Sequence, residues 1–332
     1  MRYLVTGGAG FIGSNFVRFL LRERPDTEVI NLDVLSYAGN RDNITDIMDD
    51  PRHRFIHGDI CDSNTVARAI KGIDVVVNLA AETHVDRSIS SDVHFVRTNV
   101  VGTATLLSAA LDSGVQRFIQ VSTDEVYGAL PWVDPENHDS SDTPKFTEET
   151  PVSPRSPYSA TKAAADHLTL AYHVTHGLDV IVTRCSNNYG PNQHPEKLIP
   201  LMITRALQDR PLPIYGDGLH VRDWIHVTDH CPGLLAAVEK GTPGKVYNFG
   251  GDTERTNLSV VKEILQIMDC PSDLIQHVQD RLGHDRRYAI DSSRAQSELG
   301  WEPSIAFSDG LRETVDWYVT NQSWWKNPNC SD

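Results

Sequence analysis

The chain has 332 residues, enough for one large α/β domain and a smaller one, and its 39% hydrophobic and 23% charged residues are ordinary for a globular protein. A net charge of −15 with no basic run argues against a nucleic-acid partner. No apolar stretch approaches the ~20 residues that cross a bilayer, so we expect no membrane partner. The N-terminus runs straight into the strand-like residues 2–7, so we expect no signal peptide.

Strand-like and helix-like segments alternate through the first half of the chain. Continuous apolar runs predict strands at residues 3–5, 28–33, 55–59, 74–79, 117–122 and 180–184. Apolar residues at helical spacing predict helices at residues 15–21, 100–112, 159–172, 198–208 and 260–268. Buried strands separated by helices are typical of a parallel sheet that is covered on both faces. We therefore predict an α/β fold with a Rossmann-like, doubly wound parallel sheet.

The pattern becomes irregular and loop-rich after Pro191. We predict a dinucleotide-binding domain at residues 1–190 and a smaller, irregular α/β substrate domain at residues 191–332, with segments near 221–250 returning to the first domain. Residues 129–153 are rich in Pro, Asp, Glu and Ser and follow the fifth predicted strand. This long loop is either a lid or a tolerated insertion.

The cysteines bear on metal binding and on cellular compartment. They are scattered, odd in number and form no C-x-x-C pair: Cys61, Cys185, Cys231, Cys270 and Cys330. We therefore expect no disulfide framework and no metal site, and a reducing, cytoplasmic location.

A glycine-rich segment, residues 7–13, follows the first predicted strand and opens the first helix. Small residues there let the turn tighten and the backbone approach a pyrophosphate, while the helix N-terminus attracts the phosphates. Asp33 lies 20 residues beyond Gly13, at the end of the second strand, where an acid holds the ribose hydroxyls in NAD sites. Because a carboxylate repels a 2′-phosphate, the pattern favours NAD over NADP.

Two further groups of polar residues are candidates for catalysis. Tyr158 and Lys162 are four residues apart, which puts both on one helix face. An ammonium near a phenol favours the phenolate and lowers its pKa, so the pair could remove a proton from a sugar hydroxyl. Thr123, Asp124 and Glu125 close the fifth strand, at the sheet edge where ligands bind in open parallel sheets. We expect these side chains to face a cleft.

The chain resembles the extended short-chain dehydrogenases/reductases and, among them, the dTDP-glucose 4,6-dehydratases. The resemblance covers nearly the whole length and is carried by residues 6–13, 80–88, 122–128, 158–162, 187–191, 222–224 and 283–288. The glycine and Tyr/Lys motifs mark only the superfamily. The Thr-Asp-Glu triplet marks the dehydratases, because the sugar epimerases of this superfamily lack the Asp-Glu pair there.

The resemblance implies a reaction and a role for each catalytic residue. Tyr158, assisted by Lys162 and Thr123, would deprotonate the C4 hydroxyl of the sugar. Oxidation at C4 makes C5 an α-carbon, and elimination of the C6 hydroxyl then needs a base and an acid side by side. Glu125 would take the C5 proton and Asp124 would protonate the leaving hydroxyl. The hydride finally returns to C6 and the cofactor is regenerated.

The resemblance also implies the binding residues. NAD would be held by Gly7, Gly10, Phe11, Ile12, Gly13, Asp33, Asp59, Ile60, Ala80, Ala81, Thr98, Tyr158 and Lys162. The nucleotide sugar would be held by Thr83, Asn187, Lys197, Leu198, Pro213, Tyr215, Arg222, Asn257, Arg281, His284 and Tyr288. The family more often has Ser where Thr83 stands, and the hydroxyl is retained. A homodimer is implied, formed through the helices near residues 100–112 and 159–172.

Other functions stay open at this point. A nucleotide-sugar C4 epimerase or decarboxylase would use the same fold but needs no acid at the position of Asp124. A dinucleotide-sensing regulator would be expected to lose Tyr158, Lys162 or the carboxylates, and all are present. The nucleobase is not determined, since thymidine and uridine differ by one methyl group and a 2′-hydroxyl.

Overall fold

The computed structural model describes residues 1–136 and 143–326. Its centre is a seven-stranded sheet in the order β10-β6-β5-β4-β1-β2-β3, in which every neighbouring pair is parallel. The strands are β1 (Arg2–Thr6), β2 (Glu28–Asp33), β3 (His53–His57), β4 (Val75–Asn78), β5 (Arg117–Thr123), β6 (Val180–Cys185) and β10 (Val246–Phe249). The six predicted strands are confirmed to within a few residues.

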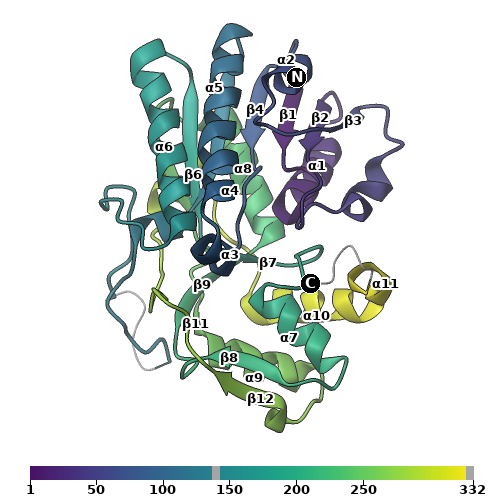
Figure 1. Cartoon of the computed structure of the whole chain (residues 1–332), viewed down its shortest axis with the longest axis vertical. Coiled ribbons are helices and arrows are strands. Elements are labelled where there is room, and N and C mark those ends of the chain that lie inside the picture. The colour runs from purple at the N-terminus through teal and green to yellow at the C-terminus, as the bar shows by residue number, and fades with distance from the viewer. Residues whose placement is uncertain (137–142, 327–332) are drawn as a thin grey trace.

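Helices cover both faces of this sheet, as Figure 1 shows, which confirms the predicted doubly wound α/β class. On one face α1 (Phe11–Glu23) packs beside α8 (Val227–Lys240), and their apolar side chains join those of β1 and β6 in one core. On the other face lie α2 (Ser63–Ala69), α5 (Thr103–Asp112) and α6 (Pro157–His176). The strands at the centre of the sheet are almost wholly buried and rich in apolar residues, whereas β3, at one edge, is partly exposed.

A smaller lobe lies below the sheet in Figure 1. It contains a three-stranded sheet, in the order β11-β9-β7, and a two-stranded sheet of β8 and β12. Its elements are β7 (Asn187–Tyr189), α7 (Leu198–Ala206), β8 (Leu212–Tyr215), β9 (Val221–His226), β11 (Glu254–Thr256), α9 (Asn257–Ile267), the 3₁₀ turn Ser272–Leu274, β12 (Ile275–Val278), α10 (Phe307–Thr320) and α11 (Gln322–Trp325). The domain division at residue 190 stays a prediction. Two elements that follow residue 190 in the sequence, α8 and β10, pack with the central sheet.

The helix expected at residues 100–112 differs in detail. Residues Val96–Gly102 form a π-helical turn, which follows α4 (Val93–Phe95) and continues into α5; α3 (Val85–Ser90) precedes them. By contrast, α6 is longer than expected. Its start is specified by a capping box between Ser156 and Ser159 with Pro157 at the first turn, and Gly177 in the left-handed conformation ends it.

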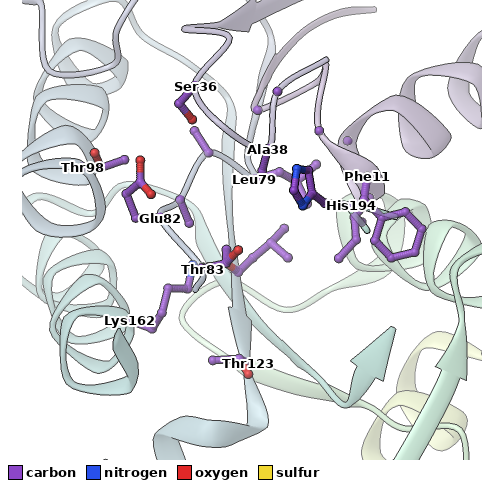
Figure 2. Close-up of a pocket in the computed structure, with 18 of the residues that line it drawn as sticks. Phe11, Ser36, Ala38, Leu79, Glu82, Thr83, Thr98, Thr123, Lys162 and His194 are labelled. Carbon is purple, nitrogen blue, oxygen red and sulfur yellow. Dashed lines mark hydrogen bonds between the residues drawn. The ribbon is translucent and has the colours of Figure 1, made fainter. Parts of the chain in front are cut away.

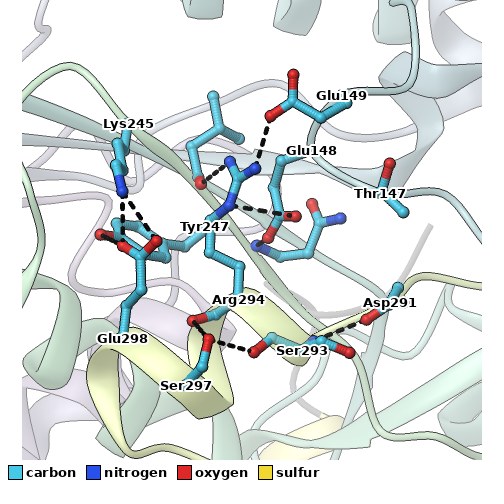
Figure 3. Close-up of polar contacts among 12 residues, drawn as sticks. Thr147, Glu148, Glu149, Lys245, Tyr247, Asp291, Ser293, Arg294, Ser297 and Glu298 are labelled. Carbon is cyan, nitrogen blue, oxygen red and sulfur yellow. Dashed lines mark hydrogen bonds and ion pairs between the residues drawn. The ribbon is translucent and has the colours of Figure 1, made fainter.

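The described parts of the loop at residues 129–153 are anchored to the rest of the chain. Residues 137–142 lie outside the described residues. The amide nitrogens of Leu130 and Phe146 donate to the carbonyl oxygens of Arg287 and Ala289 at 3.0 and 2.8 Å. Figure 3 shows Arg294, which precedes the π turn Ala295–Leu299, paired with Glu148 and Glu149. These contacts fasten the second half of the loop beside β10, and a lid role stays a prediction.

Two further expectations concern cysteines and membranes. Cys61, Cys185, Cys231 and Cys270 are free thiols, while Cys330 lies outside the described residues. Within residues 1–136 and 143–326, none of the helices combines the length and apolar character that crossing a membrane requires.

Candidate active site

A cavity of about 540 Å³ opens at the carboxyl ends of the central strands. Gly7 follows β1, Asp33 ends β2, Ala80 follows β4, Thr123 ends β5 and Cys185 ends β6, and all five residues line it. Parallel strands bring residues that are far apart in sequence to one edge of the sheet, which is where ligands bind in such folds. Figure 2 shows Lys162 and Thr123 on one side of this cavity and Phe11 and His194 on the other.

The glycine-rich turn has the geometry of a pyrophosphate cradle. Gly7 has a φ of +68°, and a Cβ there would lie 2.7 Å from the backbone nitrogen of Ala80. A Cβ on Gly13 would lie 2.1 Å from the carbonyl oxygen of Gly7. Gly10 precedes α1 without a side-chain cap, so the first amides of this helix face the cavity without a competing side-chain acceptor from that position. The turn therefore fits a dinucleotide.

Asp33 ties this turn to the end of β2. Its two carboxylate oxygens accept hydrogen bonds from the backbone nitrogens of Ala9 at 2.9 Å and Leu35 at 2.8 Å. Burial raises the pKa of Asp33, while these two amide bonds lower it. The cavity is lined by each residue expected to hold the cofactor, namely Gly7, Gly10, Phe11, Ile12, Gly13, Asp33, Asp59, Ile60, Ala80, Ala81, Thr98, Tyr158 and Lys162.

Tyr158 and Lys162 lie one turn apart on α6, and both line the cavity. Lys162 is 4% exposed, and its Nζ donates a hydrogen bond to the carbonyl oxygen of Val121 at 2.7 Å. We expected the lysine to lower the pKa of Tyr158, and here that expectation is wrong. The pKa of Tyr158 is raised well above its usual value, first because the phenol is buried and then because Glu125 lies near it. Burial also lowers the pKa of Lys162.

A buried ion pair lies behind Lys162. Asp166, one turn further along α6, accepts a hydrogen bond from the Nε of Arg184 at 3.0 Å, and neither side chain is more than 3% exposed. The carboxylate of Asp166 raises the pKa of Lys162 and so opposes the effect of burial. Asp166 therefore favours the charged form of the lysine.

The Thr-Asp-Glu triplet places its members at different depths. Thr123 caps the 3₁₀ turn Asp124–Tyr127: its Oγ1 accepts a hydrogen bond from the amide of Glu125 and donates one to Asp124, both at 3.3 Å. Thr123 and Glu125 line the cavity. Asp124 is 1% exposed and does not line the cavity, so the expectation that all three side chains face a cleft is wrong for Asp124.

The two carboxyl groups have different electrostatic surroundings. The pKa of Asp124 is raised well above its usual value, first by burial and then by the nearby Glu125 and Asp223. Burial also raises the pKa of Glu125, but Arg222, Lys197 and Arg281 all lower it. Asp124 therefore has the stronger tendency to stay protonated at neutral pH, and Glu125 the stronger tendency to ionise.

The residues expected to hold the substrate fall into two groups. Three line the cavity: Thr83, Asn187 and Lys197. The Lys197 Nζ donates to the carbonyl oxygen of Thr83 at 3.0 Å, across 114 residues. The cavity lining does not include the other residues of this set, which are Leu198, Pro213, Tyr215, Arg222, Asn257, Arg281, His284 and Tyr288.

Part of this second group forms a cluster of arginine and aromatic side chains, in which Arg281 also pairs with Asp86, Nε to Oδ1, at 2.6 Å. The Arg281 guanidinium lies 5.3 Å from the ring centre of Tyr215, and that of Arg222 lies 4.3 Å from the ring centre of Tyr288. His284 lies edge-on to Tyr215 and 3.7 Å, centre to centre, from the parallel ring of His220. Leu198 begins α7, Pro213 lies in β8 and Asn257 begins α9.

His220, Asp280 and His284 could also be considered as a metal site, because their ligand atoms lie within 4.8 Å of one another. Burial and then Arg222 lower the pKa of both imidazoles, that of His284 to about 3. Asp280 raises both pKa values and opposes this effect, while Arg222 disfavours a second cation here. The neighbouring arginines suit an anion such as a diphosphate.

The sequence patterns missed several residues in or behind the cavity wall. Tyr37 does not line the cavity, but its hydroxyl oxygen lies 3.2 Å from that of Thr83, which does, and the Arg87 guanidinium lies 4.3 Å from the Tyr37 ring centre. Glu196 is a buried acid that lies 3.3 Å from the Nε2 of His84. Figure 2 also shows Glu82 and His194 at the cavity. A signal was available for Glu196 and Tyr37, since each lies within four residues of a residue that the motifs singled out.

A doubly wound parallel sheet with a dinucleotide turn at its carboxyl edge, and a buried tyrosine–lysine pair beside that turn, define an enzyme of the short-chain dehydrogenase/reductase class. The model of the family described as GDP-mannose 4,6 dehydratase matches residues 4–314, so the chain belongs to this family.

Individual relatives are also similar over nearly their whole length. A dTDP-glucose 4,6-dehydratase of Streptomyces griseus is 53% identical over 325 residues, which cover 97% of this chain and 95% of that protein. The crystal structure of DesIV, a dTDP-glucose 4,6-dehydratase from Streptomyces venezuelae with NAD bound, has a TM-score of 0.93 at 49% identity and covers 99% of this chain and 100% of its own. A UDP-glucose 4-epimerase from Thermotoga maritima reaches a TM-score of 0.87 at 30% identity, covering 97% and 100%. Because an epimerase shares the fold, the site residues must decide between the reactions.

Proposed function

We propose that the chain is a dTDP-glucose 4,6-dehydratase, a hydro-lyase that converts dTDP-glucose to dTDP-4-keto-6-deoxyglucose and water. The observation that carries this proposal is the Asp124–Glu125 pair, two carboxyl groups with different pKa surroundings beside the Tyr158–Lys162 pair. A C4 epimerase needs only the second pair. Elimination of water across C5 and C6 needs both. The relatives described as dTDP-glucose 4,6-dehydratases support the same reaction.

The cofactor in this proposal is NAD, held by the glycine-rich turn and by Asp33. Bound there, NAD⁺ would supply an acceptor for the C4 hydride and a positive charge that favours the phenolate of Tyr158, and its reduced form would supply the hydride to C6. Asp33 holds ribose hydroxyls and disfavours a 2′-phosphate.

Tyr158 is the base for the C4 hydroxyl in this proposal. Its raised pKa means that the phenol stays protonated in the cavity until positive charge is added nearby. Lys162 is held by the Val121 carbonyl, and Asp166 favours its charged form against the effect of burial, so it is oriented before substrate binds. Thr123, at the end of β5, supplies a hydroxyl that also lines the cavity.

Glu125 and Asp124 have different roles in the elimination step. Glu125 lines the cavity and takes the C5 proton, and the cations Arg222, Lys197 and Arg281 favour its ionised form. Asp124 keeps a proton because it is buried beside two carboxyl groups, and it donates that proton to the leaving C6 hydroxyl. A general acid and a general base that are both carboxyl groups are thus kept in different protonation states by their surroundings.

The nucleotide is proposed to bind along the cluster of arginine and aromatic side chains. Arg222 and Arg281 suit the diphosphate, because guanidinium groups match phosphate oxygens. Tyr215, which is 37% exposed, and Pro213 are proposed to contact the base, while Thr83, Asn187 and Lys197 contact the sugar. Leu198, Asn257, His284 and Tyr288 complete the proposed pocket.

The reaction is tested by incubating the purified protein separately with dTDP-glucose, UDP-glucose and GDP-mannose. We expect dTDP-glucose to be consumed fastest, giving a product lighter by one water that absorbs ultraviolet light after alkali treatment. A product of unchanged mass would indicate an epimerase, and loss of carbon dioxide a decarboxylase. Either result, or no reaction with any of the three, would overturn the proposal.

We propose further that the chain forms a homodimer through the helices near residues 100–112 and 159–172. Exposed apolar side chains gather at the start of this region, on α3, α4 and the π turn: Ile89, Val93, Val96 and Val101. We expect Val101→Glu to convert a dimer to a monomer in analytical ultracentrifugation, because it places a charge in an apolar interface. Val319→Glu, on exposed α10, is the matched control. A wild-type monomer at micromolar concentration, or an unchanged dimer in Val101→Glu, would contradict this interface.

A cytoplasmic location is part of the proposal, supported by the free thiols of Cys61, Cys185, Cys231 and Cys270, since thiols persist in reducing compartments. Fractionation of the producing cells checks it.

A further inference from the structure

The C-terminal helix α11 reaches the cofactor side of the molecule. The Nε1 of Trp324 donates a hydrogen bond to the Oδ1 of Asn43 at 2.8 Å, although the two residues are 281 positions apart. Asn43 is 1% exposed and Trp324 9%. Trp324 belongs to the apolar core of the lower lobe, whereas Asn43 lies in the 3₁₀ turn Arg41–Ile47 that follows β2. Figure 1 shows α11 in the lower lobe on the side of α1.

Asn43 connects this helix to the glycine-rich turn. Its Nδ2 donates to the carbonyl oxygen of Ala9 at 2.9 Å, and the backbone nitrogen of Asn40 donates to the same oxygen at 3.0 Å. The amide of Ala9 in turn donates to Asp33. The peptide groups on both sides of Ala9 are therefore held from outside the turn.

Asn43 also connects to the substrate side of the cavity. Its Oδ1 accepts a second hydrogen bond, from the Nδ2 of Asn192 at 3.3 Å. Asn192 directly precedes Gln193 and His194, which line the cavity. The Asn43 side chain is thus held by two donors, and Trp324 provides the shorter of the two contacts.

We propose that Trp324 is a positioning residue for the dinucleotide, acting through Asn43 to hold the glycine-rich turn in the shape that accepts a pyrophosphate. The inference rests on the proposed NAD site. The turn has little freedom to adjust, because any Cβ at Gly7 or Gly13 would collide with backbone. A backbone shift at Ala9 therefore moves the amides that meet the phosphates, and binding groups must be held closely to keep their affinity.

The chain offers a matched control in the next residue. Trp325 is also buried, at 5% exposure, and its Nε1 donates to the carbonyl oxygen of Tyr318 at 2.9 Å. That bond stays within the C-terminal part of the chain. Trp324→Phe and Trp325→Phe therefore each remove one buried indole donor from the same short helix, but only the first removes a link to the cofactor turn.

The experiment follows NAD release from the purified holoenzyme during dialysis, with thermal melting measured on the same samples. We expect both variants to lower the melting temperature similarly. Trp324→Phe should release NAD roughly 3- to 10-fold faster than wild type, the range expected for one hydrogen bond, and Trp325→Phe should release it at the wild-type rate.

A second variant keeps the proposal testable if Trp324→Phe is recovered poorly. Asn43→Asp keeps the shape and the acceptor for Trp324 but removes the donor to Ala9, so it should also release NAD faster. Equal release from wild type, Trp324→Phe and Asn43→Asp would overturn the positioning role. Wild-type protein that binds no NAD would instead overturn the cofactor assignment, and because the measurement needs no sugar substrate, it is independent of the dehydratase reaction.

Discussion

Replacing Tyr158 by phenylalanine is expected to reduce turnover of dTDP-glucose by about 10²–10⁴-fold, the usual loss when a general base is removed. The variant removes the phenol oxygen that would take the C4 proton and keeps the ring that packs edge-on against Phe95. Oxidation at C4 is the entry step, so no reduced cofactor should form. The nucleotide contacts are proposed to lie elsewhere, around Arg222 and Arg281, so the affinity for substrate should change little. Steady-state kinetics and equilibrium binding of dTDP-glucose measure the two quantities separately.

Tyr172→Phe is the matched control for this variant. Tyr172 lies on the same helix α6 but packs against His176, and it does not line the cavity. Its loss should leave turnover unchanged. Near-normal turnover in Tyr158→Phe would refute the role of this tyrosine. A loss of affinity without a loss of turnover would assign Tyr158 to binding instead.

Asp124→Asn and Glu125→Gln are expected to slow elimination by about 10²–10⁴-fold while leaving oxidation at C4 much less affected. Reduced cofactor should then accumulate, which raises the near-ultraviolet absorbance of the protein. The physical reason is that both substitutions keep side-chain size and remove only the capacity to exchange a proton. Asp112→Asn, on the exposed end of α5, controls for the loss of one negative charge in Glu125→Gln.

The protonation states add a pH test of the same pair. The raised pKa of Asp124 means that it keeps its proton at a pH where an exposed aspartate is ionised. Its function as an acid is therefore lost as pH rises through the raised value, and wild-type elimination should show an alkaline limb. Asp124→Asn has no proton to lose, so the limb should be absent from its residual activity. A limb of unchanged position in the variant would show that another group causes it.

Isotopic labels separate this reaction from its alternatives. Deuterium placed at C4 of the substrate should reappear on the product methyl group, and a reaction in D₂O should place solvent deuterium at C5, where Glu125 removes the proton. An epimerase would return the label to C4. Mass spectrometry of the product measures both positions, and deuterium that remains at C4 or passes wholly to water would contradict the mechanism.

The central sheet and the cofactor turn could be predicted because their determinants are local. A strand that is buried on both faces is rich in apolar residues, so β1, β2 and β6 could be predicted from their own residues. The glycines at positions 7 and 13 follow from contacts that any Cβ would violate, which makes the motif specific to one backbone shape. Asp33 could be placed for the same reason, since the end of β2 lies beside the turn that β1 opens.

The electrostatics of the site could not be predicted in the same way. The spacing of Tyr158 and Lys162 correctly puts both on one face of α6 and at the cavity, but the pKa of the phenol depends on everything packed around it. Burial and the carboxylate of Glu125, which comes from a different part of the chain, raise it. The different surroundings of Asp124 and Glu125 likewise depend on Arg222, Lys197 and Asp223.

By itself the sequence determined the fold class, the dinucleotide turn and the candidates for acid and base, because spacing along a strand or a helix settles which residues share a face. Only the tertiary structure decided which of those candidates lie close together, how deeply each is buried and which other side chains contact them. The hydrogen bond from Trp324 to Asn43 joins residues 281 positions apart, and no local sequence pattern predicts it. Long-range contacts and burial are properties of the packed chain, and so the pKa values and the support of the cofactor turn emerge only once the chain has folded.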